Sequence, residues 1–249
     1  MIRFIGGPAR VGKTTLAREI HREIGGEYIA LDSFKHALIA VTEGERLEKL
    51  QAAPSHRTYT QEAWIDELRK RDNVVWEGLL GYLSQSQKNE DDVLIEGTLW
   101  PDFVAPYIDM NPNACAVFLG NTDHGSHLET LLESVTSDAT HNNWIADKDR
   151  AWLEGWSTYN AGRSSYMQML AQEAHLPFFD TGQLGIEEAQ KQLETYSSEK
   201  VSSGKKLAGY LRRIFGKLFP GQPTHARVRS PAKTRPVPHH RRHAHQVVR

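Results

Sequence analysis

The run Gly7–Thr15 has the spacing Gly-x-x-x-x-Gly-Lys-Thr-Thr, which fixes two glycines, a lysine and two hydroxyls in a short loop. Residues 2–5, apolar apart from Arg3, precede it and a helical pattern begins at Lys13, so the loop joins a predicted strand to a predicted helix. Glycine permits close approach of the backbone to a ligand, and a helix N-terminus attracts anions. The spacing therefore predicts a loop that binds the phosphates of a nucleoside triphosphate.

The residue types in this loop have separate expected roles. Lys13 is placed for the β- and γ-phosphates of ATP and is a predicted catalytic residue, and Thr14 is placed for the Mg²⁺ that bridges them. The alternative is a glycine-rich turn with a solvated lysine, which does not explain Lys13 and Thr14 together. The predicted nucleotide contacts come from Gly7, Arg10, Val11, Gly12, Lys13, Thr14 and Thr15.

Two acidic residues directly follow predicted strands. Asp32 follows residues 28–31, where its carboxylate could accept a proton from a substrate hydroxyl or orient that hydroxyl. The alternative is that Asp32 caps a helix that begins at Ser33. Glu96 follows residues 93–95 and is typical of the acid that holds Mg²⁺ through water. Its alternative role is a local hydrogen bond at the end of the strand.

Strand-like and helix-like patterns alternate through the first part of the chain. Alternation of this kind predicts an α/β fold, with a parallel sheet and helices on both of its faces. Ligands bind such sheets beyond the carboxyl ends of the strands, where we expect Asp32, Glu96, Asn121 and Asp180. The predicted strands are 2–5, 28–31, 93–95, 114–119 and 177–180, and the predicted helices are 13–24, 43–51, 61–71, 73–87 and 160–174.

Three stretches resemble the small-molecule kinase branch of P-loop proteins, the group that contains adenylate, shikimate and 2-phosphoglycerate kinases. They are Gly7–Thr15, Leu31–Lys35 and Leu94–Thr98. The last two look most like segments of 2-phosphoglycerate kinase-like proteins, although Lys35 stands where those proteins have an arginine. Residues 163–182 resemble the closing helix and strand of the group. The resemblance implies the P-loop fold of nucleoside and nucleotide kinases, with ATP and Mg²⁺.

The resemblance also implies a mobile lid, placed at residues 121–162, whose arginines neutralise the transferring phosphoryl group. Arg150 in the lid and Arg163 at the base of a helix are the predicted catalytic arginines, and for each the alternative is a solvated surface charge. Arg10 could reach the γ-phosphate or the acceptor. Arg57 lies where an acceptor-binding segment would be.

Residues 121–160 show no clean period but contain histidines and three tryptophans. His124 and His127, with His141 further on, have no strong spacing for a metal, so exposed histidines are the favoured interpretation. The tryptophans are more typical of lid packing than of a platform for base stacking. They are Trp144, Trp152 and Trp156.

Composition excludes several classes of protein. Cys115 is the single cysteine, so the chain forms no internal disulfide and no Cys-rich zinc site, and a reducing cytoplasm fits. No apolar run approaches the roughly twenty residues that cross a bilayer. The N-terminus is a predicted strand that leads into a functional loop, so we expect no cleavable signal peptide. These observations predict a cytoplasmic protein without a transmembrane segment.

Charge divides the chain sharply, although the whole sequence carries only −1. Residues 203–249 contain 12 Lys and Arg residues and no Asp or Glu. We therefore predict a kinase-like domain at 1–197 and a basic tail at 198–249. Within the tail, residues 205–219 have an apolar stripe opposite a basic face, which predicts an amphipathic helix, and the Pro-, Arg- and His-rich residues 220–249 are predicted to be disordered.

The basic tail has several possible partners. The favoured interpretation is that its helix packs on the core and the rest of the tail is solvated. The other candidates are a weak anionic partner, either a membrane surface or a nucleic acid, and the tail's own acidic domain.

Two functions of different classes follow from these patterns. The first is an ATP-dependent kinase that transfers the γ-phosphate to a hydroxyl or phosphate of a small molecule, with a zeta-toxin-like kinase of a nucleotide sugar as a variant. The second is a regulatory ATP-binding protein or ATPase that is coupled to an anionic partner through the tail. No extended apolar run ends in Asp-Glu, and motor-type motifs do not recur, so the sequence favours the kinase.

Overall fold

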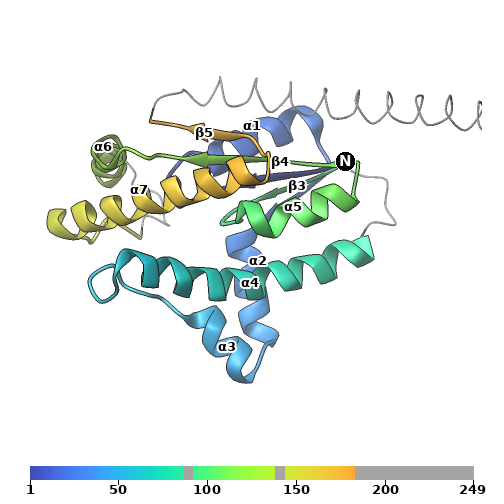
Figure 1. Ribbon diagram of the computed structural model, residues 1–249, viewed down its shortest axis with the longest axis horizontal. Helices are drawn as coiled ribbons and strands as arrows, with labels where there is room; N and C mark the ends of the chain where they lie inside the picture. Colours follow the sequence, from blue (N-terminus) through green and yellow to red (C-terminus); the bar gives the residue numbers. More distant parts are fainter. Residues whose placement is uncertain (87–91, 138–143, 183–249) are drawn as a thin grey trace, which may run out of the picture. The chain divides into compact units, whose positions relative to one another are not determined.

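Five short strands pair in parallel into one sheet. The computed structural model describes residues 1–86, 92–137 and 144–182, and within these ranges the strands have the order β2-β3-β1-β4-β5 (Figure 1). Each lies within a residue or two of a predicted segment. They are β1 (Ile2–Gly6), β2 (Glu27–Ala30), β3 (Val93–Glu96), β4 (Ala114–Gly120) and β5 (Phe178–Asp180).

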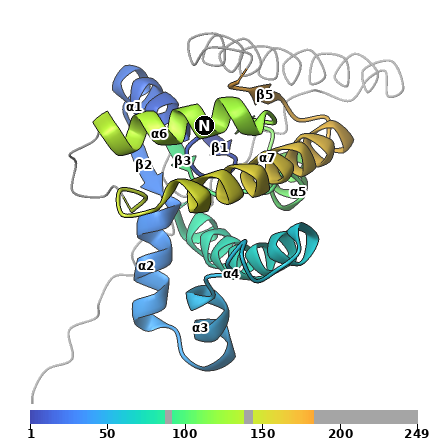
Figure 2. The same ribbon diagram turned by 90° about the vertical axis from the view of Figure 1, so that its left-hand side faces the viewer.

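Helices connect these strands and cover both faces of the sheet. Figures 1 and 2 show α1 on one side of the sheet and α4 and α5 on the other, while α2 and α3 extend away from it. In the described part of the chain the helices are α1 (Lys13–Ile24), α2 (Leu31–Val41), α3 (Gly44–Gln51), α4 (Gln61–Ser86), α5 (Pro101–Met110), α6 (His124–Ser137) and α7 (Arg150–Glu173).

Successive residues of each central strand face opposite sides of the sheet. In β1, Phe4 packs into the cluster on the α4 and α5 side, whereas Ile5 packs with Leu16 of α1. All three side chains are fully buried, and complete burial of a large apolar side chain contributes about 1.5–3 kcal/mol to the stability of the fold. The predicted α/β class, a parallel sheet with helices on both faces, is confirmed.

The strand order reverses at β1, which lies between β3 and β4. The chain adds β2 and β3 on one side of β1 and then β4 and β5 on the other. In open parallel sheets ligands bind beyond the carboxyl ends of the strands at such a switch point. The loop that follows β1 is Gly7–Gly12, so the topology brings the predicted phosphate loop to this position.

The predicted break between helices 61–71 and 73–87 is wrong, because α4 is one helix that runs through Asp72. In the sequence, Asp72 lies in a run of charged residues that resembles the end of a helix. Its carboxylate instead accepts hydrogen bonds from Trp100 and Arg163, which come from distant parts of the chain. The backbone therefore continues without interruption.

The last long helix begins earlier than predicted. We expected a helix at 160–174, but α7 begins at Arg150. Asp149 caps it, since its Oδ1 accepts a hydrogen bond from the backbone N–H of Trp152 at 2.7 Å. In the first half of α7, buried polar side chains interrupt the periodic spacing of apolar residues. They are Ser157 and Asn160. The sequence therefore does not reveal this part of the helix.

Several predictions fall outside the described residues. They include the amphipathic helix at 205–219, the disordered segment at 220–249, the domain boundary at 197 and His141. Across the three described ranges, no helix combines the length and the apolar content that crossing a bilayer requires.

Candidate functional site

The loop between β1 and α1 has a backbone that glycine makes possible. Gly7 has φ 138°, and a Cβ at this position would lie 2.1 Å from the carbonyl oxygen of Leu119. Gly12 has φ 88° and caps α1 in the left-handed region. Arg10, which is not a glycine, also has a positive φ of 62°. Unusual backbone of this kind concentrates at functional sites.

The N-terminus of α1 is open to an anion. No side chain caps this end, and the first turn contains no acidic residue. The first N–H groups of a helix have no partners within the helix, and they carry partial positive charge. The end of α1 can therefore bind phosphate oxygens through backbone groups alone.

Lys13 is a buried cation beneath this loop. Its side chain is 8 % exposed, and its Nζ donates a hydrogen bond to the carbonyl oxygen of Pro8. Among the described residues, no carboxylate lies at ion-pair distance from Lys13. Burial lowers the pKa of Lys13 to about 8, although the negative charges of Glu96 and Asp32 partly offset this effect. A phosphate group would supply the counter-charge.

Glu96 lies at the carboxyl end of β3, next to the start of α1. Its Oε1 accepts hydrogen bonds from Thr14 Oγ1 at 3.3 Å and from the phenol of Tyr28 at 3.1 Å. Burial, the charge of Glu96 and its hydrogen bond together raise the pKa of Tyr28 to about 12. Glu96 and Thr14, the two predicted metal residues, are therefore in direct contact.

These oxygens form a small donor set for a metal. Carboxylate and hydroxyl oxygens are the hard ligands that Mg²⁺ prefers, and Mg²⁺ completes its shell with water and phosphate. Within the described ranges, His, Cys, Asp and Glu side chains form no cluster of three or more that could hold an ion. Thr14 Oγ1 and Glu96 could therefore supply only part of a Mg²⁺ shell, with water or phosphate oxygens as the other ligands.

Asp32 lies in the first turn of α2, immediately after β2. Its side chain is exposed, and its charge acts on Lys13. The suggested cap of a helix at Ser33 is wrong, since α2 begins at Leu31 with Ala30 as the N-cap. β2 runs directly into α2, so Asp32 carries an exposed carboxylate at the sheet edge and does not cap the helix.

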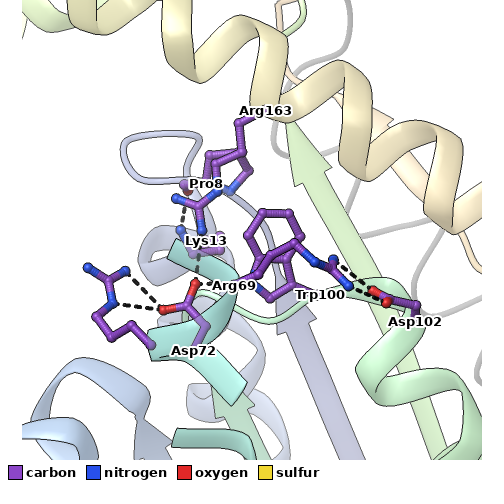
Figure 3. A network of polar contacts seen from close by, with 8 residues as sticks. Pro8, Lys13, Arg69, Asp72, Trp100, Asp102 and Arg163 are labelled. Carbon is purple, nitrogen blue, oxygen red and sulfur yellow. Dashed lines mark hydrogen bonds and ion pairs between the residues drawn. The ribbon is translucent and has the colours of Figure 1, made fainter. Parts of the chain in front are cut away.

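Arg163 projects from the middle of α7 toward the phosphate loop. Figure 3 shows its side chain reaching from α7 toward Asp72, and the charge of Arg163 contributes to lowering the pKa of Lys13. The guanidinium lies 4.8 Å from the ring centre of Trp100 and donates to Asp72 at 3.2 Å. Its Nε has no hydrogen-bond partner among the described residues. Arg163 is therefore buried beside Lys13 rather than solvated.

Arg150 lies apart from this group. It begins α7, where its side chain is 71 % exposed and bonds to Glu154 at 2.9 Å. Arg163 comes thirteen positions later in the helix, which corresponds to a distance of about 20 Å along the axis. The structure therefore brings Arg163 to the loop but not Arg150. Arg57 is also exposed and contacts Asp149 at 3.4 Å.

The three tryptophans of the predicted lid pack against one another. Trp152 and Trp156 are stacked with ring centres 5.8 Å apart, and Trp144 meets both edge-on. His127 is fully buried against Trp156, so the expectation of an exposed histidine is wrong for this residue. His124 is exposed, as expected, and begins α6.

Polar side chains connect the ends of β4 and β5. Thr122 donates to Oδ2 of Asp180, and the N–H of Gly182 donates to its Oδ1 at 3.0 Å. The N–H of Asn121 donates to Ser164 of α7 at 3.0 Å. The predicted position of Asn121 and Asp180 at this edge of the sheet is confirmed.

The sequence interpretation missed three residues that shape the site. They are Tyr28, Asp72 and Trp100. Each acts through a side chain far away in the sequence, and Asp72 and Arg163 are separated by 91 positions. The alternating faces of a strand could have indicated the position of Tyr28, because residues 28 and 30 face the same side of β2. Asp72 and Trp100 carried no local signal.

Comparison with solved structures identifies kinases with a similar fold. Shikimate kinase from Bacteroides thetaiotaomicron is 18% identical with a TM-score of 0.48, over 79% of this chain and 97% of that chain. Shikimate kinase from Acinetobacter baumannii in complex with shikimate is 17% identical with a TM-score of 0.47, over 80% and 94%. A gluconokinase from Sinorhizobium meliloti is 13% identical with a TM-score of 0.46, over 81% and 95%.

Identities at this level concern the fold alone. The sheet order 2-3-1-4-5 follows from the strand pairing of this chain itself, and with TM-scores below 0.5 no conclusion about its activity rests on these matches. No family model matches the chain, and no curated protein matches it.

Proposed function

We propose that this chain is an ATP-dependent kinase, a phosphotransferase that passes the γ-phosphate of ATP to a hydroxyl or phosphate group of a small molecule. The observation that carries the proposal is the buried cation of Lys13, which has no carboxylate at ion-pair distance among the described residues, beneath the open N-terminus of α1. A buried cation is costly unless a partner compensates it. The phosphates of ATP are the partner that this loop fits.

The residues around Lys13 support phosphoryl transfer rather than binding alone. Lys13 and the N–H groups of α1 would hold the phosphates, and bound Mg²⁺ would neutralise developing charge beside Thr14 and Glu96. Asp32 is exposed near Lys13, so its carboxylate can accept the proton of an acceptor hydroxyl. Arg163 supplies a second fixed cation beside the loop. We retain Arg150 as a lid candidate that would act only after closure.

The test is a screen for transfer from ATP. Nucleoside monophosphates, sugars and small acids are incubated with ATP and Mg²⁺, and phosphorylated products are detected by mass spectrometry. We expect one class of acceptor to be phosphorylated by the wild type and not by Lys13→Ala. Lys49→Ala is the matched control, because Lys49 is an exposed lysine paired with Glu45. Transfer by Lys13→Ala at the wild-type rate would contradict the proposal.

The alternative is a regulatory ATP-binding protein or ATPase that acts through its tail on an anionic partner. The charge of residues 203–249 favours an anionic partner of this kind, either a membrane surface or a nucleic acid. Removal of residues 203–249 separates the two functions. A kinase retains its ATP turnover after truncation, whereas loss of turnover would favour the regulatory protein.

We also propose a cytoplasmic location. The chain has a single cysteine, Cys115, which is buried, so no disulfide can form within the chain. A chain without internal disulfides and the use of ATP both suit a reducing compartment.

A further inference from the structure

Tyr28 and Glu96 are neighbours on one face of the sheet. The register pairs Ala30 of β2 with Glu96 of β3 and Tyr28 with Leu94. Residues two apart share a face of a strand, so Tyr28 is the diagonal neighbour of Glu96 on the side that packs against α1. This position lets the Tyr28 phenol reach Glu96 Oε1 at 3.1 Å.

The same carboxylate oxygen also accepts the hydroxyl hydrogen of Thr14. The distance from Thr14 Oγ1 to Glu96 Oε1 is 3.3 Å. A threonine hydroxyl has one hydrogen and two lone pairs, so a hydrogen directed at Glu96 leaves the oxygen lone pairs for another partner. The orientation of the Glu96 carboxylate therefore decides how Thr14 presents its oxygen.

We propose that Tyr28 is a positioning residue for the magnesium site, because it holds the Glu96 carboxylate in the orientation that turns the oxygen of Thr14 toward the metal. This inference rests on the proposed function, since it assumes that Mg²⁺ accompanies ATP at the loop. Tyr28 acts through Glu96 and is not itself proposed as a ligand of the metal. Outer hydrogen bonds of this kind orient the groups that hold a metal.

The environment of Tyr28 suits a fixed donor. Glu96 is 6 % exposed, so water has little access to replace the phenol. The phenol is therefore a fixed donor to this carboxylate.

The test separates metal-dependent from metal-independent nucleotide binding. Binding of a non-hydrolysable ATP analogue is measured by calorimetry for wild type and Tyr28→Phe, first in EDTA and then at increasing Mg²⁺. We expect Tyr28→Phe to need about 10-fold more Mg²⁺ for half of the gain in affinity. Its affinity in EDTA should stay within about 2-fold of wild type, because the loop and Lys13 are unchanged.

The matched control is Tyr82→Phe. The Tyr82 phenol also donates to a glutamate, Glu27, which lies on the same strand as Tyr28. That contact is exposed and lies outside the phosphate site. Tyr82→Phe should therefore bind Mg²⁺ and nucleotide as the wild type does. Thermal unfolding of both variants verifies that they are folded.

Three outcomes would overturn the inference in different ways. If the wild type gains affinity with Mg²⁺ and Tyr28→Phe needs no more Mg²⁺, the role of Tyr28 is wrong and the proposed function stands. If Tyr28→Phe loses as much affinity in EDTA as in Mg²⁺, the phenol has a structural role only. If the wild type shows no gain with Mg²⁺, the proposed function fails, and the role of Tyr28 fails with it.

Discussion

Arg163 of α7 and Asp72 of α4 form an ion pair at 3.2 Å in which each side chain is only 5 % exposed. Asp72 also accepts from Trp100 Nε1 at 3.0 Å and pairs with Arg71 at 2.9 Å (Figure 3). Burial lowers the pKa of Arg163 to about 10, although Asp72 acts in the opposite direction. Each buried charge is therefore stabilised by the other. Asp72 holds the Arg163 guanidinium beside the phosphate loop.

We predict that Asp72→Asn lowers the free energy of unfolding by about 3 kcal/mol, because it leaves a buried guanidinium without a counter-charge. Urea denaturation followed by circular dichroism measures the loss. Asp102→Asn is the control, since the pair of Asp102 with Arg69 is more exposed and should contribute about 1 kcal/mol or less. Adding Arg163→Met to Asp72→Asn should restore part of the stability. Equal losses in the two single variants would contradict a special role for the buried pair.

The phosphate loop and the strand positions could be predicted because their signals are local. Gly7, Gly12 and Lys13 lie within seven consecutive residues, and a short apolar run such as residues 114–119 marks a buried strand without any knowledge of its partners. Asp32 and Glu96 could be placed for the same reason. Both follow a strand directly, and parallel topology brings such positions to one edge.

The remainder of the site depends on contacts between distant residues. The sequence predicts Arg163 as a functional arginine, but nothing in the residues next to it in the sequence shows that Asp72 and Trp100 hold it. Arg150 has the same residue type and a similar setting in the sequence, yet it pairs with Glu154 at the surface. Only the three-dimensional packing of α4 and α7 distinguishes these two arginines.

Lys13 should make ATP binding depend on pH in a defined direction. Its pKa is about 8 in the free protein, so the ammonium loses its proton as the pH rises through 8. Bound phosphates favour the charged form, so binding above pH 8 must take up a proton. We predict weaker binding and proton uptake at pH 9 compared with pH 7. Calorimetry in buffers with different ionisation enthalpies measures both, and Lys13→Met should show no proton uptake from this group.

Asp32→Asn should separate catalysis from binding. The amide cannot accept the acceptor proton, so we expect transfer to a hydroxyl acceptor to slow by about 100-fold while ATP affinity stays unchanged. Steady-state kinetics with the acceptor found in the screen, and calorimetry with ATP, measure these two quantities. Asp109→Asn is the control, because Asp109 is an exposed carboxylate at the end of α5. An unchanged rate in Asp32→Asn would exclude the carboxylate as the base.

His127 should make the fold sensitive to acid. It is fully buried, its Nδ1 lies 3.2 Å from Ser157 Oγ, and Ser157 donates to the carbonyl oxygen of His124 at 2.6 Å. Ser157 uses its hydrogen on His124, so Nδ1 of a neutral His127 is the donor to Ser157. Burial lowers the pKa of His127 to about 4, although a contact with the backbone of Ala9 raises it slightly. In the unfolded chain a histidine titrates near 6.5.

Between pH 6.5 and 4 the unfolded state therefore binds one more proton than the folded state, so stability falls as the pH falls through this window. The loss attributable to His127 should reach about 2 kcal/mol at pH 5. Urea denaturation at pH 7 and pH 5 measures it for the wild type, for His127→Gln and for His36→Gln, which changes an exposed histidine. His127→Gln should lose less stability between the two pH values than the other two proteins. If all three proteins lose the same stability between pH 7 and pH 5, a group other than His127 makes the fold sensitive to acid.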